Sequence, residues 1–376
     1  MKIATLGIQS TVSHWAGVVR LAHPTIRAHA PLFWLVAAQI SCAAALKLAY
    51  PDMTSFDAGS FLMSLGFFVF GIIPVSVVTL RFYHVARYLR PRHPISALAR
   101  DVRAYFGSPD RFANGMIIVV LYVPFISTFS YLKSNIPNIQ PFSWDATFTE
   151  WDRIIFMGNL PWELLQPLIG FAPITFAINV LYNLWFAVMW ITVVAFAFAR
   201  TTSVLRTRFF LTFFVIWSVG GSFVAIVFSS AGPCYYQDLG LSPNPYASLM
   251  LYLQNADDLF PILALETQAL LWAGYEGDSL ALGISAMPSM HNATALLLAL
   301  VGWKVNRRLG VALSVFAATI FVGSVALAWH YAVDGFVAYA LTLLAWWMCG
   351  RFACWWEARG PASTNLRTDA RFSVDA

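Results

Sequence analysis

The feature that most constrains this chain is a series of long apolar runs separated by short basic turns. Each run approaches the roughly 20 residues that an α-helix needs to cross the hydrocarbon core of a bilayer. Lipid offers the backbone no hydrogen-bond partners, so such runs must be helical. The sequence therefore predicts an all-α, polytopic transmembrane helical bundle of about eight spans. We place the spans at residues 31–50, 59–80, 114–132, 173–199, 209–231, 288–303, 310–326 and 330–350.

Composition agrees with a membrane location. Charged residues make up 11% of the chain, against roughly 25% in soluble domains. The net charge of +5 does not indicate nucleic acid, because the basic residues flank the spans. The four cysteines show no paired metal-ligand spacing, and the N-terminus has no short apolar run with a cleavage site. We expect membrane lipids as partners, no nucleic acid, no disulfide framework and no removable signal peptide.

Two long segments, 133–172 and 232–284, lie between predicted spans and are rich in Trp, Pro and acidic residues. Their apolar pieces are too short to cross a bilayer. We therefore expect the first to be interfacial or re-entrant and the second to be a loop.

The distribution of basic residues predicts an orientation. If the N-terminus is cytoplasmic, the cytoplasmic segments hold 20 of the 23 Lys and Arg residues, which is the bias expected of such loops. The opposite side receives only Lys47, Lys133 and Arg153. We predict that both termini are cytoplasmic. The 19 Arg against 4 Lys, with abundant Ala, suggest a GC-rich genome and hence a bacterial plasma membrane.

Two of the seven histidines stand apart from the rest. His291 belongs to the sequence Pro-Ser-Met-His and His330 to His-Tyr-Ala-Val-Asp, whereas the other five precede residue 94 in Arg-rich segments. The topology places both at the non-cytoplasmic ends of neighbouring spans. A single histidine there is often only a capping residue, but two ionisable residues at matching depth usually mark function.

The residues around each histidine suggest phosphate chemistry. Pro288 suits the first position of a helix, which would leave the following amides and the Ser289 hydroxyl free to bind an anion; a plain helix cap is the alternative. His330 and Asp334 are four residues apart and should share one helix face. A carboxylate on one imidazole nitrogen leaves the other as a nucleophile or base. The set suits phosphoryl transfer through a phosphohistidine, with no cofactor; a zinc site of two His and one Asp is a weaker alternative.

These two motifs resemble the second and third motifs of the type-2 phosphatidic acid phosphatase superfamily, closest to its inositolphosphotransferase and inositol-phosphorylceramide-synthase branch. The resemblance covers about residues 145–350. It includes three weaker similarities, at Ser230-Ala231-Gly232-Pro233 with Tyr235-Tyr236, at Tyr182-Asn183 and at Asp152-Arg153. The resemblance implies a catalytic core of six helices. We expect an N-terminal membrane region at 1–113, the catalytic core at 114–350 and a cytoplasmic polar tail at 351–376.

The resemblance also implies roles. His330 would be the nucleophile, Asp334 its orienting partner, His291 the acid that protonates the leaving oxygen, and Ser289 a phosphate ligand. The chain departs from the phosphatase branch, because Gly323-Ser324 stand where that branch has Ser-Arg. Its first motif, Lys-x6-Arg-Pro, is matched only by Arg90-Pro91, on the side predicted to be cytoplasmic.

Something cationic should replace the missing arginine, and Arg153 is our candidate, unless it pairs with Asp152 or Glu150. Tyr182 and Asn183 could line a substrate cavity or could bond a neighbouring helix.

The leading hypothesis is a membrane phosphotransferase that moves a phospho-headgroup, such as phosphoinositol, between lipids, with its active site on the outer face. The alternatives are a phosphatase of lipid phosphates or isoprenyl pyrophosphates, and a non-catalytic lipid-binding or transport protein.

Overall fold

The computed structural model describes residues 3–277 and 283–359, and the regular elements in those ranges are all helices. Seven helical segments are long and apolar enough to cross a membrane. They are Ile26–Ala49 in α1 (Ile3–Ala49); Phe61–Leu89, built from α2 (Ala58–Gly66), η1 (Phe67–Ile72), α3 (Ile73–His84) and η2 (Val85–Leu89); α5 (Pro109–Ser134); α9 (Ala172–Ala197); Val204–Val227, built from α10 (Val204–Val215), η3 (Ile216–Val224) and α11 (Ala225–Val227); α15 (Arg307–Ala326); and α16 (Ala332–Ala358). The predicted all-α bundle is confirmed.

The predicted sixth span is a shorter helix than the others. Helix α14 comprises Met290–Val305, 16 residues, or about 24 Å at 1.5 Å per residue. It forms an antiparallel hairpin with α15, and Asn306 caps α15 by accepting a hydrogen bond from the Leu309 N–H at 2.9 Å. The hairpin brings the end of α15 back to the end of the bundle where α14 begins.

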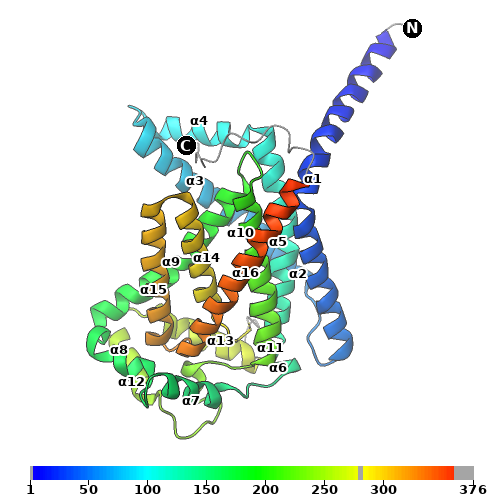
Figure 1. The fold of residues 1–376 in the computed structure, drawn as a ribbon. Coiled ribbons are helices and arrows are strands. Elements are labelled where there is room, and N and C mark those ends of the chain that lie inside the picture. The colour runs from blue at the N-terminus through cyan, green and yellow to red at the C-terminus, as the bar shows by residue number, and fades with distance from the viewer. Residues whose placement is uncertain (1–2, 278–282, 360–376) are drawn as a thin grey trace.

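The two long segments fold into short helices at that same end of the bundle (Figure 1). The first contains α6 (Ile136–Ile139), α7 (Asp145–Ile155) and α8 (Pro161–Ile169), and the second contains η4 (Pro233–Tyr235), α12 (Ala247–Asp257) and α13 (Leu263–Glu276). As expected, none of these helices is long enough to span a membrane. We call this end the histidine end.

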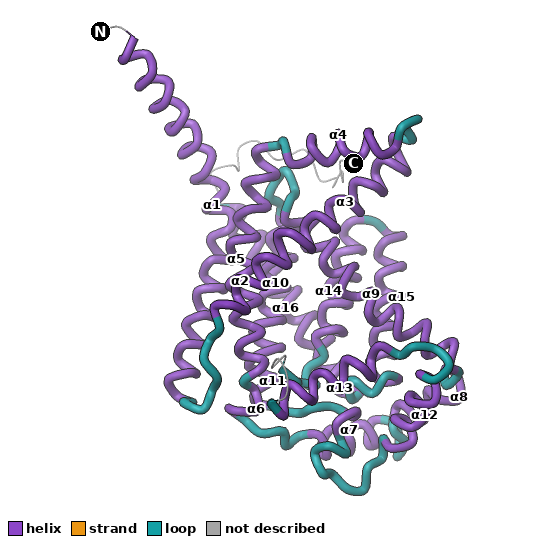
Figure 2. The backbone as a smooth tube through the Cα atoms, turned by 180° about the vertical axis from the view of Figure 1, so that it is seen from behind, coloured by secondary structure: helices purple, strands orange, loops and turns teal. Residues whose placement is uncertain are grey.

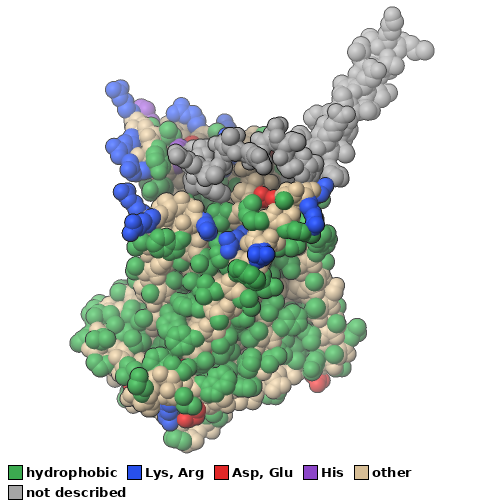
Figure 3. All heavy atoms as spheres, in the orientation of Figure 1, with side chains coloured by type: hydrophobic (Ala, Val, Ile, Leu, Met, Phe, Trp, Pro, Cys, Tyr) green, Lys and Arg blue, Asp and Glu red, His purple; other side chains and the backbone are tan. Residues whose placement is uncertain are grey.

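The other end of the bundle is basic. Helix α4 (Pro94–Phe106) lies across it and packs against α3, η2 and α5 (Figures 1 and 2). Figure 3 shows most of the visible Lys and Arg side chains gathered there, with hydrophobic side chains over most of the same face. Arg90 follows η2, in the connection from α3 to α4, and both of these helices reach the basic end (Figure 1). The Arg90-Pro91 sequence is therefore far from the histidines and not part of their site. Residues 360–376 of the predicted tail lie outside the described ranges.

Aromatic packing fixes the position of α14 in the bundle. The ring of Phe213 stacks on Trp217 with centroids 5.2 Å apart, and Trp217 Nε1 donates a hydrogen bond to Thr294 Oγ1 at 3.1 Å. A Cβ atom on Gly221 would lie 2.7 Å from the ring of Phe129 and 3.1 Å from Met290 Sδ. Glycine thus allows η3 to approach the start of α14 closely.

Candidate active site

The bundle brings the two isolated histidines together. His291 is the second residue of α14, and His330 lies two residues before α16 begins. Their ring centroids are 6.5 Å apart. His330 is 7% exposed, so the pair lies within the protein at the histidine end.

Asp334 holds His330 as expected, but by a different geometry. His330 Nδ1 lies 3.2 Å from Asp334 Oδ2. Because α16 begins at Ala332, the two residues do not share a helix face as predicted. Asp334 is instead the third residue of the helix, and the same Oδ2 accepts the Tyr331 N–H at 3.1 Å. One buried carboxylate thus caps the helix and orients the imidazole, which also has a hydrogen bond with the Ala286 backbone.

A second carboxylate, from α7, also binds the start of α16. The two oxygens of Asp152 accept the N–H groups of Ala332 at 2.8 Å and Val333 at 2.9 Å. Burial raises the pKa of Asp152 to about 7, while these two backbone hydrogen bonds act in the opposite direction. Asp152 therefore holds the helix start that carries His330.

A third carboxylate, Asp145, was missed by the sequence analysis. It accepts hydrogen bonds from the Gly232 N–H and the Tyr331 hydroxyl, both at 2.8 Å, and from the Ala231 N–H at about 3.0 Å. It is 1% exposed. The only sequence signal was an acidic residue at the start of a short amphipathic segment.

The Ser230–Pro233 segment contacts the two loops that lead to the histidines. Ser230 accepts the Ala286 N–H through its carbonyl at 2.9 Å and the Met287 N–H through its hydroxyl at 3.2 Å. Gly232 has φ +114°, and a Cβ atom there would lie 2.7 Å from the Trp329 carbonyl oxygen. The segment is therefore hydrogen-bonded to the residues just before Pro-Ser-Met-His and packs closely against the residue just before His330.

Ser289 is the cap of α14, so the prediction that Pro288 is the first helical residue was wrong. The Ser289 hydroxyl accepts from the Asn292 N–H at 3.4 Å and from Asn292 Nδ2 at 3.0 Å. Its own N–H donates to the Asp334 carbonyl at 3.3 Å. Within the described ranges the amides of Met290 and His291 have no acceptor, which leaves two N–H groups and the helix dipole for an anion.

Helix α9 supplies an aromatic wall for His291. The Tyr182 ring stacks on the imidazole at 4.6 Å between centroids, and Trp185 lies at 4.2 Å. Neither the His291 ring nor the buried Tyr182 hydroxyl has a hydrogen-bond partner among the described residues. The ring is thus held by packing, and its nitrogens are open to a ligand.

The other two predicted ligands, Arg153 and Asn183, form contacts other than those with the histidines. Arg153 Nη1 pairs with Glu150 Oε1 at 3.2 Å, and the two side chains are 40% and 61% exposed. This surface pair is the alternative that the sequence left open. Asn183 is exposed, and its amide donates to the Asn179 carbonyl at 2.8 Å, which favours a bond within α9 over substrate binding.

Lys133, in the last turn of α5, is a cation near enough to act on the histidines. Its charge acts on both His291 and His330. The backbone of Lys133 also abuts the chain just before Pro-Ser-Met-His, since a Cβ atom on Gly283 would lie 2.6 Å from the Lys133 carbonyl carbon. The sequence placed Lys133 on this side of the membrane but did not single it out.

A zinc site finds no support in the ligand geometry. The part of the chain that the structure describes contains no group of three or more His, Cys, Asp or Glu able to hold a metal ion.

The fold and the site together define an integral membrane protein with paired histidines, one oriented by a carboxylate, at one end of a helical bundle. A family model described as the PAP2 superfamily matches residues 149–348. This is more than half of the chain, and the chain belongs to that superfamily, a membership consistent with a lipid phosphatase or phosphotransferase. Comparisons with curated proteins and with solved structures gave no match. The predicted superfamily is confirmed, while the inositolphosphotransferase branch stays a prediction.

Proposed function

We propose that this protein is a membrane phosphotransferase that moves a phospho-headgroup from one lipid to another through a phosphohistidine on His330. The observation that carries the proposal is the pair of rings 6.5 Å apart, with His330 bound by Asp334 and His291 free of hydrogen bonds to the described residues. A nucleophile oriented by a carboxylate beside a second proton carrier is the arrangement that covalent catalysis requires.

In the first step, Nε2 of His330 attacks the phosphorus of a lipid phosphodiester. The N–P bond forms, the bond from phosphorus to the lipid oxygen breaks, and protonated His291 gives its proton to that oxygen. The amides of Met290 and His291 and the charge of Lys133 offset the negative charge that develops on the phosphoryl oxygens.

In the second step, the hydroxyl of an acceptor lipid attacks the phosphohistidine. The new O–P bond forms, the N–P bond breaks, and His291 takes the hydroxyl proton, which restores both histidines. A water molecule in place of the lipid hydroxyl would release the phospho-headgroup into water and make the protein a hydrolase. The two reactions share every residue of the site.

The environment of Ser324 favours the transferase over a phosphatidate phosphatase. Ser324 stands where the phosphatase branch has arginine, and it is 1% exposed. It accepts a hydrogen bond from Asn292 Nδ2 at 3.1 Å, and its carbonyl accepts the His330 N–H at 2.9 Å. Because this position is small and fully buried, no arginine from it reaches a terminal phosphate, which supports a substrate other than phosphatidate.

The test uses the full-length protein purified in detergent with phosphatidylinositol labelled in the inositol ring. Wild type, His330→Ala and His93→Ala are assayed with and without ceramide, or a diacylglycerol whose acyl chains differ from those of the donor. We expect a new labelled lipid only when acceptor is present, from wild type and from the control His93→Ala, because His93 is exposed at the basic end.

Three results would redirect the proposal. Water-soluble labelled phosphoinositol that forms without acceptor would establish a hydrolase. Release of inorganic phosphate from phosphatidate or an isoprenyl pyrophosphate, with no reaction of phosphatidylinositol, would establish the phosphatase alternative. Equal product from wild type and His330→Ala would exclude the phosphohistidine and favour a lipid-binding or transport role.

A further inference from the structure

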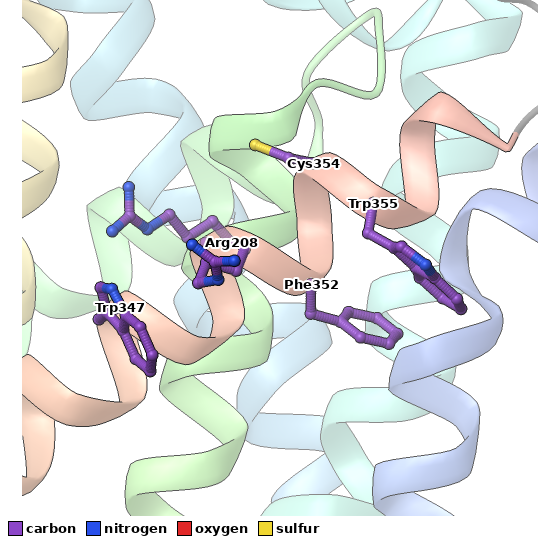
Figure 4. A pocket seen from close by; sticks show the side chains of 7 residues that line it. Arg208, Trp347, Phe352, Cys354 and Trp355 are labelled. Carbon is purple, nitrogen blue, oxygen red and sulfur yellow. The ribbon is translucent and has the colours of Figure 1, made fainter.

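A cavity lies at the basic end, on the surface formed by α10 and α16. It has a volume of about 690 Å³. Figure 4 shows Arg208 at its centre, with Trp347 to one side and Phe352 to the other. The lining is Arg208, Trp347, Gly350, Arg351, Phe352, Cys354 and Trp355. This cavity is separate from the histidine site, which lies at the opposite end of α16.

Arg208 is held in a fixed position within this cavity. Its Nε donates to the Trp346 carbonyl at 2.9 Å, and its guanidinium carbon lies 3.7 Å from the centroid of the Trp346 ring. A Cβ atom on Gly350 would lie only 2.5 Å from Nε, so glycine provides the space for the guanidinium. The two Nη groups have no acceptor among the described residues, which leaves them free for a ligand.

The rest of the lining combines a second positive charge with apolar surface. Arg351 lies over the ring of Trp347 at 5.6 Å, and the lining contains no acidic residue. The side chains of Trp347 and Trp355 are 57% and 47% exposed. A ligand that fits must therefore carry negative charge and an apolar part.

The depth of the cavity in the bilayer matches a lipid headgroup. Arg351 is 19 residues beyond Ala332, where α16 begins at the histidine end. At 1.5 Å per residue this is about 28 Å, close to the roughly 30 Å thickness of the hydrocarbon core. Arg351 therefore lies near the headgroup level of the leaflet at the basic end, with Trp347 one turn deeper.

We propose that this cavity binds an anionic phospholipid of the leaflet at the basic end. The guanidinium groups of Arg208 and Arg351 hold the phosphate, since arginine presents paired N–H donors to phosphate oxygens. The ring of Trp347, one turn deeper, contacts the acyl chains, and the rings of Phe352 and Trp355 contact the lipid at the level of its headgroup. Free phosphate would leave those rings uncovered, and the cationic headgroup of a zwitterionic lipid would place a third positive charge beside the two arginines.

The test is native mass spectrometry of the full-length protein in detergent, with dioleoyl phosphatidylglycerol, dioleoyl phosphatidylcholine or inorganic phosphate added. We expect retained phosphatidylglycerol on wild type and about a tenfold loss of its affinity in Arg208→Gln/Arg351→Gln. Gly350→Ala should weaken binding as well, although both charges remain, because the added methyl group displaces Arg208.

The matched control is Arg307→Gln/Arg308→Gln, which removes the same charge at the same end, from exposed positions on α15. It should bind like wild type. Equal loss in the control, equal retention of phosphatidylcholine, or retention of inorganic phosphate in place of lipid would each overturn the proposal. Thermal unfolding checks that each variant is folded. If Arg208→Gln/Arg351→Gln is unfolded, the single variant Arg351→Gln is tested in its place.

Discussion

At the scale of single residues, the site depends on side chains that serve the backbone and the chemistry at once. Asp334 caps α16 and binds His330 through the same oxygen. Ser289 caps α14 while its N–H binds the Asp334 carbonyl. The two helix starts are thus joined to each other, and the separation of the histidines follows from how the helices are capped.

Replacing Lys133 or Arg153 with a neutral residue tests which of the two cations acts on the substrate phosphate. We expect Lys133→Gln to lower kcat/KM at least about tenfold, because an unscreened charge near a reacting phosphate is worth over 1.4 kcal/mol. Arg153→Gln should change it less than about twofold, since an exposed ion pair contributes little. Initial rates on labelled phosphatidylinositol give both values. Similar losses in the two variants would return Arg153 to the site.

Gly232 can be compared with Gly240, because both have positive φ, +114° and +70°, but only Gly232 lacks space for a Cβ atom. Alanine costs roughly 1–3 kcal/mol in such backbone conformations. We therefore expect Gly232→Ala to lower the thermal midpoint by several degrees more than Gly240→Ala and to lower activity. Equal midpoints would mean that the Trp329 carbonyl moves aside without cost.

At the scale of elements, the start of α16 is the most heavily bound segment of the site. Asp152 binds its first two amides, Asp334 binds the amide of the residue before it, and Asp145 binds the Tyr331 hydroxyl. Two of these carboxylates come from α7, so this short helix positions the proposed nucleophile.

The pKa of Asp152 predicts how the contribution of this residue to the stability of the protein depends on pH. Burial raises the pKa of this carboxyl from 3.8 to about 7. The folded protein then binds more protons than the unfolded chain between these values, so the contribution of Asp152 to stability falls as pH rises through that window. The thermal midpoint of wild type minus that of Asp152→Asn should decrease from pH 5 to pH 8. An increase would mean that the helix amides stabilise the carboxylate more than burial disfavours it.

At the scale of the whole molecule, the two ends of the bundle differ in charge and in proposed task. Basic residues gather at the end that carries α4 (Figure 3), and the histidines lie at the end covered by α7, α12 and α13 (Figure 1). The proposed reaction and the proposed lipid site thus belong to opposite leaflets.

Single cysteines in a cysteine-free background test the orientation. Thr201 and Gln237 are both exposed, at the basic end and the histidine end respectively. In right-side-out vesicles, a membrane-impermeant maleimide should label Gln237→Cys and not Thr201→Cys, because basic loops stay in the cytoplasm. Inverted vesicles should give the reverse pattern. The opposite result in both preparations would place the histidines on the cytoplasmic side.

The sequence by itself determined the helical class, the extent of most spans, the two ends and the pairing of His291 with His330. These features are local or nearly so: span length follows from apolar runs, and two short hairpin turns are enough to return α16 to the start of α14. The tertiary structure decided what surrounds the pair. Asp145 and Tyr331 are 186 residues apart, and Lys133 acts on histidines more than 150 residues further along the chain. Such contacts depend on the packing of all the helices, and no periodicity or spacing encodes them. For the same reason, Arg153 and Asn183 matched a motif but bond to their own helices, because only packing decides which way a side chain on a helix faces.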